Sequence, residues 1–168
     1  MNMKYFHGFA IILLLFASVN VHAQTFKSEG DFKKYFTEHA DSLDPVEGLW
    51  TVNTTQEFYN YDTLYDSKSF SQTVAVIKRD SVFFSYDMKG GAYNVYFNKT
   101  KVNKVYLFKI FLKEINQYTK ADAVISADRT MEYNYEFPKQ YLQLVFKDSF
   151  ESGEHVENKV TWNKIFPK

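Results

Sequence analysis

Hydrophobic and polar residues alternate with a period of two along most of the chain from residue 46 onward. The run "TMEYNYEF" (130–137) shows the pattern most cleanly, with Met131 and Tyr133 on one face and Glu132 and Asn134 on the other. Because successive side chains of a strand point to opposite faces, such runs predict half-buried β-strands. Comparable β-rich runs occur at 48–54, 72–80, 81–88, 89–98, 104–112, 122–127, 141–148 and 159–166.

The predicted strands are short and are joined by turn residues, such as Arg79-Asp80 and Gly90-Gly91. No helical pattern alternates with them, so they predict an antiparallel all-β domain rather than a parallel sheet. A sandwich and a barrel both fit this pattern. We favour an all-β fold, an antiparallel up-and-down β-barrel of about eight strands, formed by residues 46–168.

Residues 24–45 form a predicted N-terminal helical segment ahead of the strands. Phe32 and Phe36 repeat at helical spacing, and Ser28 with Asp31 resembles a capping box. The Asp-Pro pair at the end of the segment stops the helix, because a residue before proline avoids the α conformation. The apolar face predicts a helix that packs on the barrel, and binding of a partner protein is the alternative.

The first 23 residues resemble a secretory signal peptide. Lys4 supplies a positive start, the apolar run "FAIILLLFA" follows, and Val21-His22-Ala23 fits a cleavage site before Gln24. The apolar run is shorter than the about 20 residues that span a bilayer, so we favour cleavage after Ala23 over a retained anchor. We therefore expect an exported protein, periplasmic or extracellular, with no membrane anchor after cleavage.

Composition limits the partners of the predicted exported chain. It has no cysteine, so neither a disulfide nor the lipid-modified cysteine of a bacterial lipoprotein can form. The full sequence balances 20 basic against 20 acidic residues, and loss of Lys4 with the signal peptide changes this only to a net charge of −1; this argues against binding of nucleic acid, since that requires clustered positive charge. Aromatic residues make up 19% of the chain, a fraction that favours strands and a well-filled interior.

Residues that could carry out catalysis or bind a metal are few. His39 and His155, the two histidines after residue 23, lack neighbouring ligands at the spacing of a zinc site. The Gly-x-Ser-x-Gly motif of serine hydrolases is absent. Glu132 and Glu136 share a strand face, but about 13 Å along a strand is too far for a retaining pair of carboxylates. We therefore expect no enzymatic activity, no cofactor and no metal.

Two family resemblances add to this interpretation. Gly48-Leu49-Trp50 resembles the Gly-x-Trp motif of the lipocalins and the wider calycin group. That resemblance implies that Trp50 closes the barrel base, and that a basic residue near the last strand, here Lys164, lies over its ring. The segments "LDPVEGLW" (with a DPxEGxW motif), "VAVIKRDSVFF" and "TWNKIFP" also resemble, in this order, a secreted β-domain of Bacteroidota. No activity is assigned to that family, so the second resemblance implies origin and fold alone.

Aromatic residues at alternating positions are the candidate ligand-binding residues. If the barrel interior is open, they line a pocket for a lipid, sterol-like or aromatic ligand, because ligand pockets are mostly apolar with few polar groups. The alternative is that they fill a closed core, as in many small barrels. The candidates are Phe84, Tyr86, Tyr93, Phe97, Tyr133 and Tyr135. We predict an exported, non-enzymatic barrel that binds a small apolar ligand, and the alternative is a protein-interaction or accessory module with a filled core.

Three Asp-Ser or Asp-Thr pairs precede an apolar residue. This pattern resembles the O-glycosylation signal of exported Bacteroidota proteins, which makes the hydroxyl residue of each pair a candidate site. The alternative is turn chemistry, because Asp, Ser and Thr cluster in turns. The three candidate residues are Ser42, Thr63 and Ser81.

Overall fold

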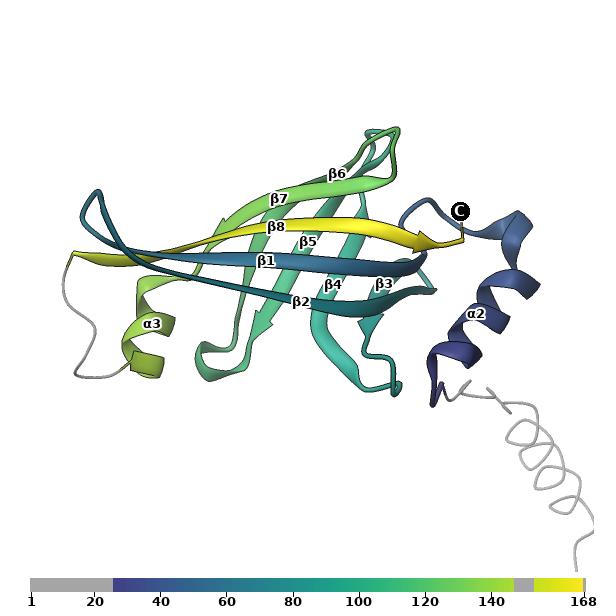
Figure 1. Cartoon of the computed structure of the whole chain (residues 1–168), viewed down its shortest axis with the longest axis horizontal. Helices are drawn as coiled ribbons and strands as arrows, with labels where there is room; N and C mark the ends of the chain where they lie inside the picture. Colours follow the sequence, from purple (N-terminus) through teal and green to yellow (C-terminus); the bar gives the residue numbers. More distant parts are fainter. Residues whose placement is uncertain (1–25, 147–152, 168) are drawn as a thin grey trace, which may run out of the picture.

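The chain folds into a closed barrel of eight antiparallel strands that follow one another in sequence order (Figure 1). The computed structural model describes residues 26–146 and 153–167. Each strand pairs with the next one, and β8 pairs with β1 to complete the ring. The predicted antiparallel up-and-down barrel is therefore confirmed. The strands are β1 (Gly48–Asn60), β2 (Thr63–Arg79), β3 (Val82–Tyr86), β4 (Ala92–Lys99), β5 (Val105–Leu112), β6 (Gln117–Ile125), β7 (Thr130–Glu136) and β8 (Glu154–Phe166).

Short helical elements lie at the two ends of the barrel. Helix α2 lies against one end, and α3 lies at the opposite end (Figure 1). Within the described ranges, no helix is long and apolar enough to cross a membrane. The predicted signal peptide (1–23) and its cleavage site lie outside the described residues. The helical elements are α2 (Glu29–Glu38), η1 (Ala40–Ser42), η2 (Lys113–Ile115) and α3 (Lys139–Phe146).

Helix α2 is capped as predicted and packs on its own barrel. The Ser28 side chain accepts a hydrogen bond from the Asp31 backbone N–H at 3.3 Å, which satisfies one of the free donors at the helix start. Phe32 and Phe36 have no exposed surface. They belong to an apolar group on the outside of the barrel that we call the outer cluster, made of Phe26, Phe32, Phe36, Leu49, Ala75, Ile77 and Tyr86.

The predicted strand at 141–148 is wrong, because residues 139–146 form helix α3. Its alternating leucines resembled a strand, but Pro138 directly precedes the helix, where the fixed φ of proline suits a first turn. The Pro138 carbonyl accepts hydrogen bonds from the backbone N–H groups of Tyr141 (2.8 Å) and Leu142 (3.2 Å). Leu142 is buried, and the helix packs against η2. Residues 147 and 148 lie outside the described residues.

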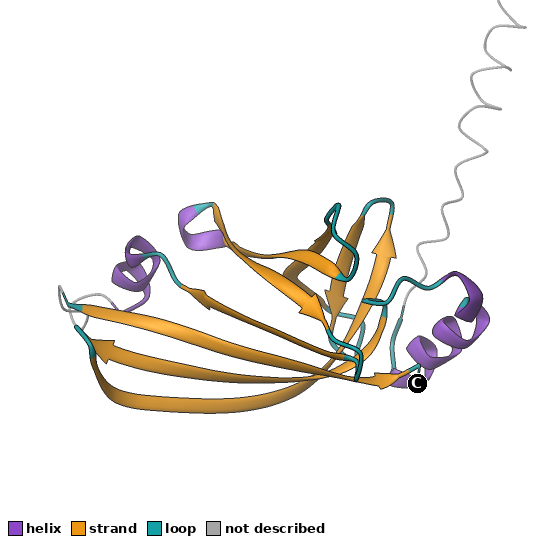
Figure 2. Cartoon of the chain, turned by 90° about the horizontal axis from the view of Figure 1, so that it is seen from above, coloured by secondary structure: helices purple, strands orange, loops and turns teal. Residues whose placement is uncertain are grey.

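The barrel has a tightly paired end and a wider end. β1, β2 and β8 contain 13, 17 and 13 residues, and Figure 2 shows them extending beyond the shorter strands as a curved ribbon. On β2, only residues 75–79 pair with β3, so the earlier part of this strand pairs with β1 alone among the described residues. We call the half near Gly48 and Phe166 the closed half. The half near the β1–β2 hairpin and α3 is the open half.

The β6–β7 ladder is the shortest in the barrel. In the described chain it consists of two residue pairs, Val124 with Glu132 and Ile125 with Met131, both toward the closed half. Toward the open half, the Thr119 hydroxyl donates to the Glu136 carbonyl at 3.0 Å and joins the same two strands through a side chain. The ring is therefore continuous in the closed half and loosely joined between β6 and β7 in the open half.

Candidate functional site

Inward-facing residues change from apolar to polar midway along each of the three long strands, and apolar residues return farther along at Phe58 of β1 and Val156 of β8. On β1, Trp50 and Val52 are followed by Thr54 and Gln56. The register aligns this change across neighbouring strands, because Gln56 lies opposite Asn158 of β8. The same change occurs on β2, from Val76 and Val74 to Gln72, and on β8, from Trp162 and Val160 to Asn158. The sequence thus builds a hydrophobic closed half and an amide-bearing open half from the same strands.

Four aromatic side chains form a floor across the barrel between the two halves. The Phe108 ring lies 4.1 Å from that of Tyr133, and Phe97 lies 5.3 Å from Trp162, both measured between centroids. The Trp162 indole N–H donates to the Tyr133 hydroxyl at 2.8 Å, so both buried polar groups have a partner. Burial raises the pKa of Tyr133 well above its ordinary value. The floor rings are thus packed and hydrogen-bonded as one layer.

Above this floor, the inner wall of the open half is partly exposed. Tyr93 and Tyr135, together with three aliphatic side chains, pack against the core but keep part of their surface free. The Tyr93 hydroxyl donates to the Gln72 side-chain carbonyl at 2.9 Å. The Gln56 amide N–H donates to Asn158 at 2.9 Å. The aliphatic members of the wall are Val95, Ile110 and Ala121.

The open half therefore combines apolar walls with a few polar groups at fixed positions. Asn158, with no exposed surface, also donates to the Tyr135 backbone carbonyl at 3.4 Å, so its orientation is set from two strands. Burial raises the pKa of Tyr135, which keeps its hydroxyl neutral at ordinary pH. Such a surface suits a neutral or weakly polar molecule, since apolar contact area dominates and the amides can accept or donate hydrogen bonds.

The six predicted pocket residues divide into three groups. Tyr93 and Tyr135 lie on the wall of the open half, whereas Phe97 and Tyr133 are buried in the floor. Phe84 and Tyr86 lie outside the barrel, against the outer cluster beneath α2. Their predicted place in an interior pocket is therefore wrong. The run "VFFSY" is apolar on both faces because α2 covers the outer one, so alternation alone did not identify the inner face.

The structure brings together the three residues that the lipocalin resemblance implied for the barrel base. Trp50 is buried, its indole N–H donates to the Val46 carbonyl at 2.9 Å, and the Lys164 ammonium lies 5.5 Å from its ring centroid. Gly48 has φ of 142°, and a Cβ there would lie 2.3 Å from the Phe166 carbonyl oxygen. Only glycine fits this approach of β1 to the end of β8.

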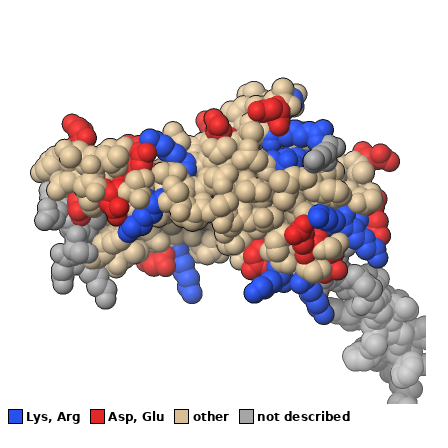
Figure 3. All heavy atoms as spheres, viewed as in Figure 1, with Lys and Arg blue, Asp and Glu red and all other residues tan. Residues whose placement is uncertain are grey.

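The surface histidines and the candidate glycosylation residues lie away from the open half's wall. His39 stacks on Tyr35 and His155 stacks on Tyr59. In the part of the chain that the structure describes, no three His, Cys, Asp or Glu side chains gather as metal ligands would. Acidic and basic side chains are interspersed over the face shown in Figure 3. Ser42, Thr63 and Ser81 are all exposed, each at or next to a turn or strand end.

Sequence reasoning missed the amides of the open half, namely Gln56, Gln72 and Asn158. The available signal was their position, since each continues the inward-facing register of an apolar strand. Comparisons with protein-family models, with curated proteins and with solved structures found no match.

Proposed function

We propose that this protein is an exported, non-enzymatic β-barrel of lipocalin-like type that binds a small apolar ligand in the open half of its barrel. The observation that carries the proposal is the difference in side-chain exposure between the two sides of the aromatic floor. Phe97 and Trp162 in the floor, and Trp50 below them, are at most 3% exposed. Above it, Tyr93, Tyr135 and the aliphatic wall residues pack against the core but keep part of their surface free.

The chemistry of the wall indicates the class of ligand. An aromatic or aliphatic body can pack on Val95, Ile110 and the rings of Tyr93 and Tyr135. A single hydroxyl or carbonyl group on that body can exchange hydrogen bonds with the Gln72 or Gln56 amide. A lipid, a sterol-like molecule or an aromatic compound fits this description, whereas a highly charged molecule would lose hydration without gaining an ion pair.

Binding of N-phenyl-1-naphthylamine, whose fluorescence increases in apolar surroundings, tests the proposal on a chain of residues 24–168. Ala121→Phe adds a ring to the inner wall, so we expect it to weaken probe binding about tenfold or more. Asp122→Phe is the matched control, because this exposed residue lies on the outer face of the same strand. Equal probe binding by both variants, with folding verified by circular dichroism, would contradict binding in the open half.

A second candidate function is the docking of a partner protein at the open end. Apolar side chains surround that end, with Tyr61 72% exposed at the β1–β2 turn and Leu144 51% exposed on α3. Patches of this kind often mark interaction sites. Native mass spectrometry of the protein purified from its own host separates the two functions. A bound mass of a few hundred daltons favours the ligand, and a bound protein favours the partner.

A further inference from the structure

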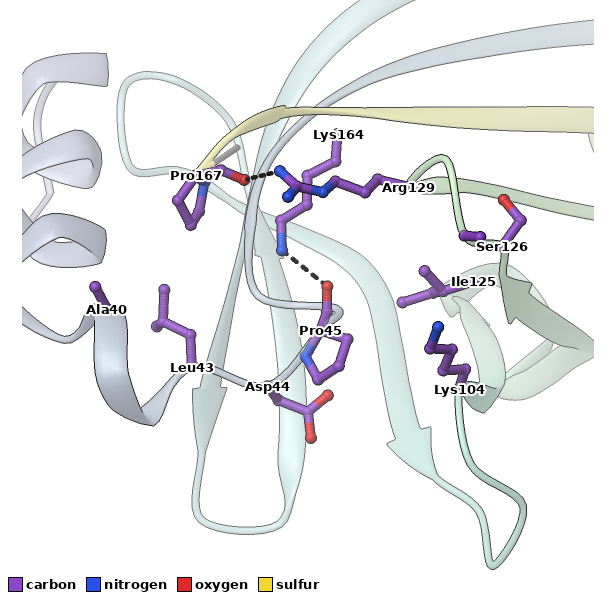
Figure 4. Close-up of a pocket in the computed structure, with 11 residues that line it drawn as sticks. Ala40, Leu43, Asp44, Pro45, Lys104, Ile125, Ser126, Arg129, Lys164 and Pro167 are labelled. Atoms are coloured by element: carbon purple, nitrogen blue, oxygen red, sulfur yellow. Dashed lines mark hydrogen bonds between the residues drawn. The ribbon is translucent and has the colours of Figure 1, made fainter.

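A second pocket lies at the closed end of the barrel, on the far side of the floor from the proposed ligand site. Its volume is about 340 Å³. Figure 4 shows that its lining comes from the segment before β1, the β4–β5 loop, the β6–β7 turn and the end of β8. Leu43, Pro45 and Ile125 give it an apolar side, and Lys104, Arg129 and Lys164 give it three positive charges.

Backbone hydrogen bonds hold the three basic residues at the strand ends. The Lys104 carbonyl accepts from the Ile125 N–H at 2.9 Å, and the Arg129 carbonyl accepts from the Lys164 N–H at 3.1 Å. Lys104 and Arg129 have φ of 60° and 66°, a left-handed conformation that non-glycine residues adopt at a cost. Three segments far apart in the sequence are thus fixed around one opening.

We call Lys104, Arg129 and Lys164 the basic cluster. Their positive charges are not neutralised by ion pairs with carboxylates of the described residues. Among the described residues, none of the three forms an ion pair. Lys164 donates to the Pro45 carbonyl at 2.8 Å, and Arg129 donates to the Pro167 carbonyl at 3.4 Å (Figure 4). Both partners are neutral, and most N–H donors of the ammonium and the guanidinium remain available.

The nearest acidic groups are already committed to other donors. Asp44 also lines the pocket, and its carboxylate accepts from the Lys99 ammonium at 2.7 Å and from the Tyr106 hydroxyl. Burial acts to raise the pKa of Asp44, but the hydrogen bonds from Lys99, Tyr106 and the Val46 N–H, together with the charge of Lys99, outweigh it and the pKa is lowered. Glu47 accepts from the backbone N–H groups of Asp44 and Lys78, each at 2.9 Å. The pocket therefore keeps an excess of positive charge.

The lowered pKa of the Lys164 ammonium is consistent with a site that lacks a negatively charged partner. Burial, and then the nearby charge of Arg129, lower its pKa to about 8, while Glu47 and Asp44 act in the opposite direction. An anion in the pocket would offset both the burial and the repulsion between the two cations. A guanidinium beside two ammonium groups is also suited to the oxygens of a phosphate or carboxylate.

We propose that this pocket binds a small organic anion, with its phosphate or carboxylate group held by Lys104, Arg129 and Lys164. The apolar part of the anion packs against Leu43, Pro45 and Ile125. The pocket shares no residue with the wall of the open half. The proposed anion binding is therefore independent of the ligand binding proposed for the open half.

Titration of the ¹⁵N-labelled chain (residues 24–168) with inorganic phosphate, phenyl phosphate and benzoate tests this site by NMR. We expect saturable amide shifts at Ser126, Arg129 and Lys164. Phenyl phosphate should bind more tightly than inorganic phosphate, because its ring uses the apolar side. Equal affinities would overturn the apolar part of the proposal, and the absence of saturable shifts with all three anions would overturn it entirely. Comparison of phenyl phosphate with benzoate identifies the preferred anionic group.

Charge-removing variants locate the binding. Arg129→Gln and Lys104→Gln each change an exposed side chain, so the barrel core stays intact. Each should weaken binding about tenfold, the loss expected for one hydrogen bond to a charged group. Lys101→Gln, in the same β4–β5 loop but outside the pocket lining, should leave the affinity unchanged. Equal weakening by Lys101→Gln would show attraction to general surface charge and would overturn the proposal.

Discussion

The closed and open halves of the barrel are built by the same long strands in the same register, yet their interiors differ in kind. In the closed half, Trp50 of β1, Val76 of β2 and Trp162 of β8 pack with almost no exposed surface. In the open half, the next inward positions of those strands carry amides, and the tyrosines beside them are only partly covered. The closed half therefore stabilises the fold through apolar burial, whereas the wall of the open half contributes less buried area and is the place of the ligand site that we propose.

The largest expected difference between the halves is in stability. Trp162→Ala removes a buried ring from the floor and should lower the free energy of unfolding by about 3–5 kcal/mol. Tyr93→Ala removes a partly exposed ring above the floor and should cost about 1–2 kcal/mol, since it loses less buried area and one hydrogen bond. Urea denaturation of both variants measures the two values. Similar losses would mean that the open half contributes to the core as much as the closed half does.

Substitution of Gly48, compared with Gly30, tests how rigid the base of the closed half is. Gly48→Ala places a Cβ against the Phe166 carbonyl at a φ that alanine rarely adopts, so we expect a loss of about 2–3 kcal/mol. Gly30→Ala in helix α2 is the control, because its nearest neighbour would be 3.6 Å away. That change should be stabilising by about 0.5–1 kcal/mol. A mild effect at Gly48 would show that the base of the closed half can adjust.

The pH dependence of stability tests Lys164 at the base of the closed half. Its folded-state pKa of about 8 lies below the ordinary lysine value of about 10.4, so between these values the unfolded chain binds more protons. Stability should therefore rise with pH across this window in the wild type relative to Lys164→Met. We expect about 1 kcal/mol after allowing for the partial exposure of the ammonium. Denaturation curves at pH 7.5 and 10 for both proteins measure it, and parallel changes would contradict the lowered pKa.

The smallest expected effect concerns a polar group in the closed half. The Ser85 side chain is 1% exposed, lies opposite Val76, and has no hydrogen-bond partner for its hydroxyl among the described residues. Ser85→Ala should raise the free energy of unfolding by about 0.5–1 kcal/mol, because an unsatisfied buried hydroxyl is removed. Thr54→Ala serves as a comparison at a buried hydroxyl nearer the open half. Destabilisation by Ser85→Ala would show that this hydroxyl is hydrogen-bonded in solution.

Much of the fold could be predicted because strand alternation is a local signal. The hairpin at Asp80 and the strand at 130–136 followed directly from the order of residues. Helix α3 could not be identified in the same way, since Leu142 and Leu144 also fit a period of two. The deciding feature was Pro138, whose carbonyl begins the helix and whose ring excludes a continued ladder.

The candidate site was only partly predictable because it depends on which face of a strand is covered. Tyr93 and Tyr135 lie on the interior wall, but Phe84 and Tyr86 face α2, which the alternation of β3 does not reveal. The three residues of the basic cluster come from three separate segments, which lie close together only in the folded barrel. Neither Lys104 nor Arg129 carries a sequence signal for its left-handed backbone, so their meeting with Lys164 follows from topology alone.

The short β6–β7 ladder makes this the strand pair with the fewest backbone pairings in the described ring. Opening the barrel between most strand pairs would break a row of backbone hydrogen bonds, whereas between β6 and β7 the open half is joined through the Thr119 hydroxyl. Separating these strands in the open half breaks one hydrogen bond, worth about 1 kcal/mol, in addition to the side-chain contacts between them, and leaves the two residue pairs of the closed half intact. If the open half binds a ligand as proposed, this seam is where the ring can widen with the smallest loss of backbone hydrogen bonds and without global unfolding.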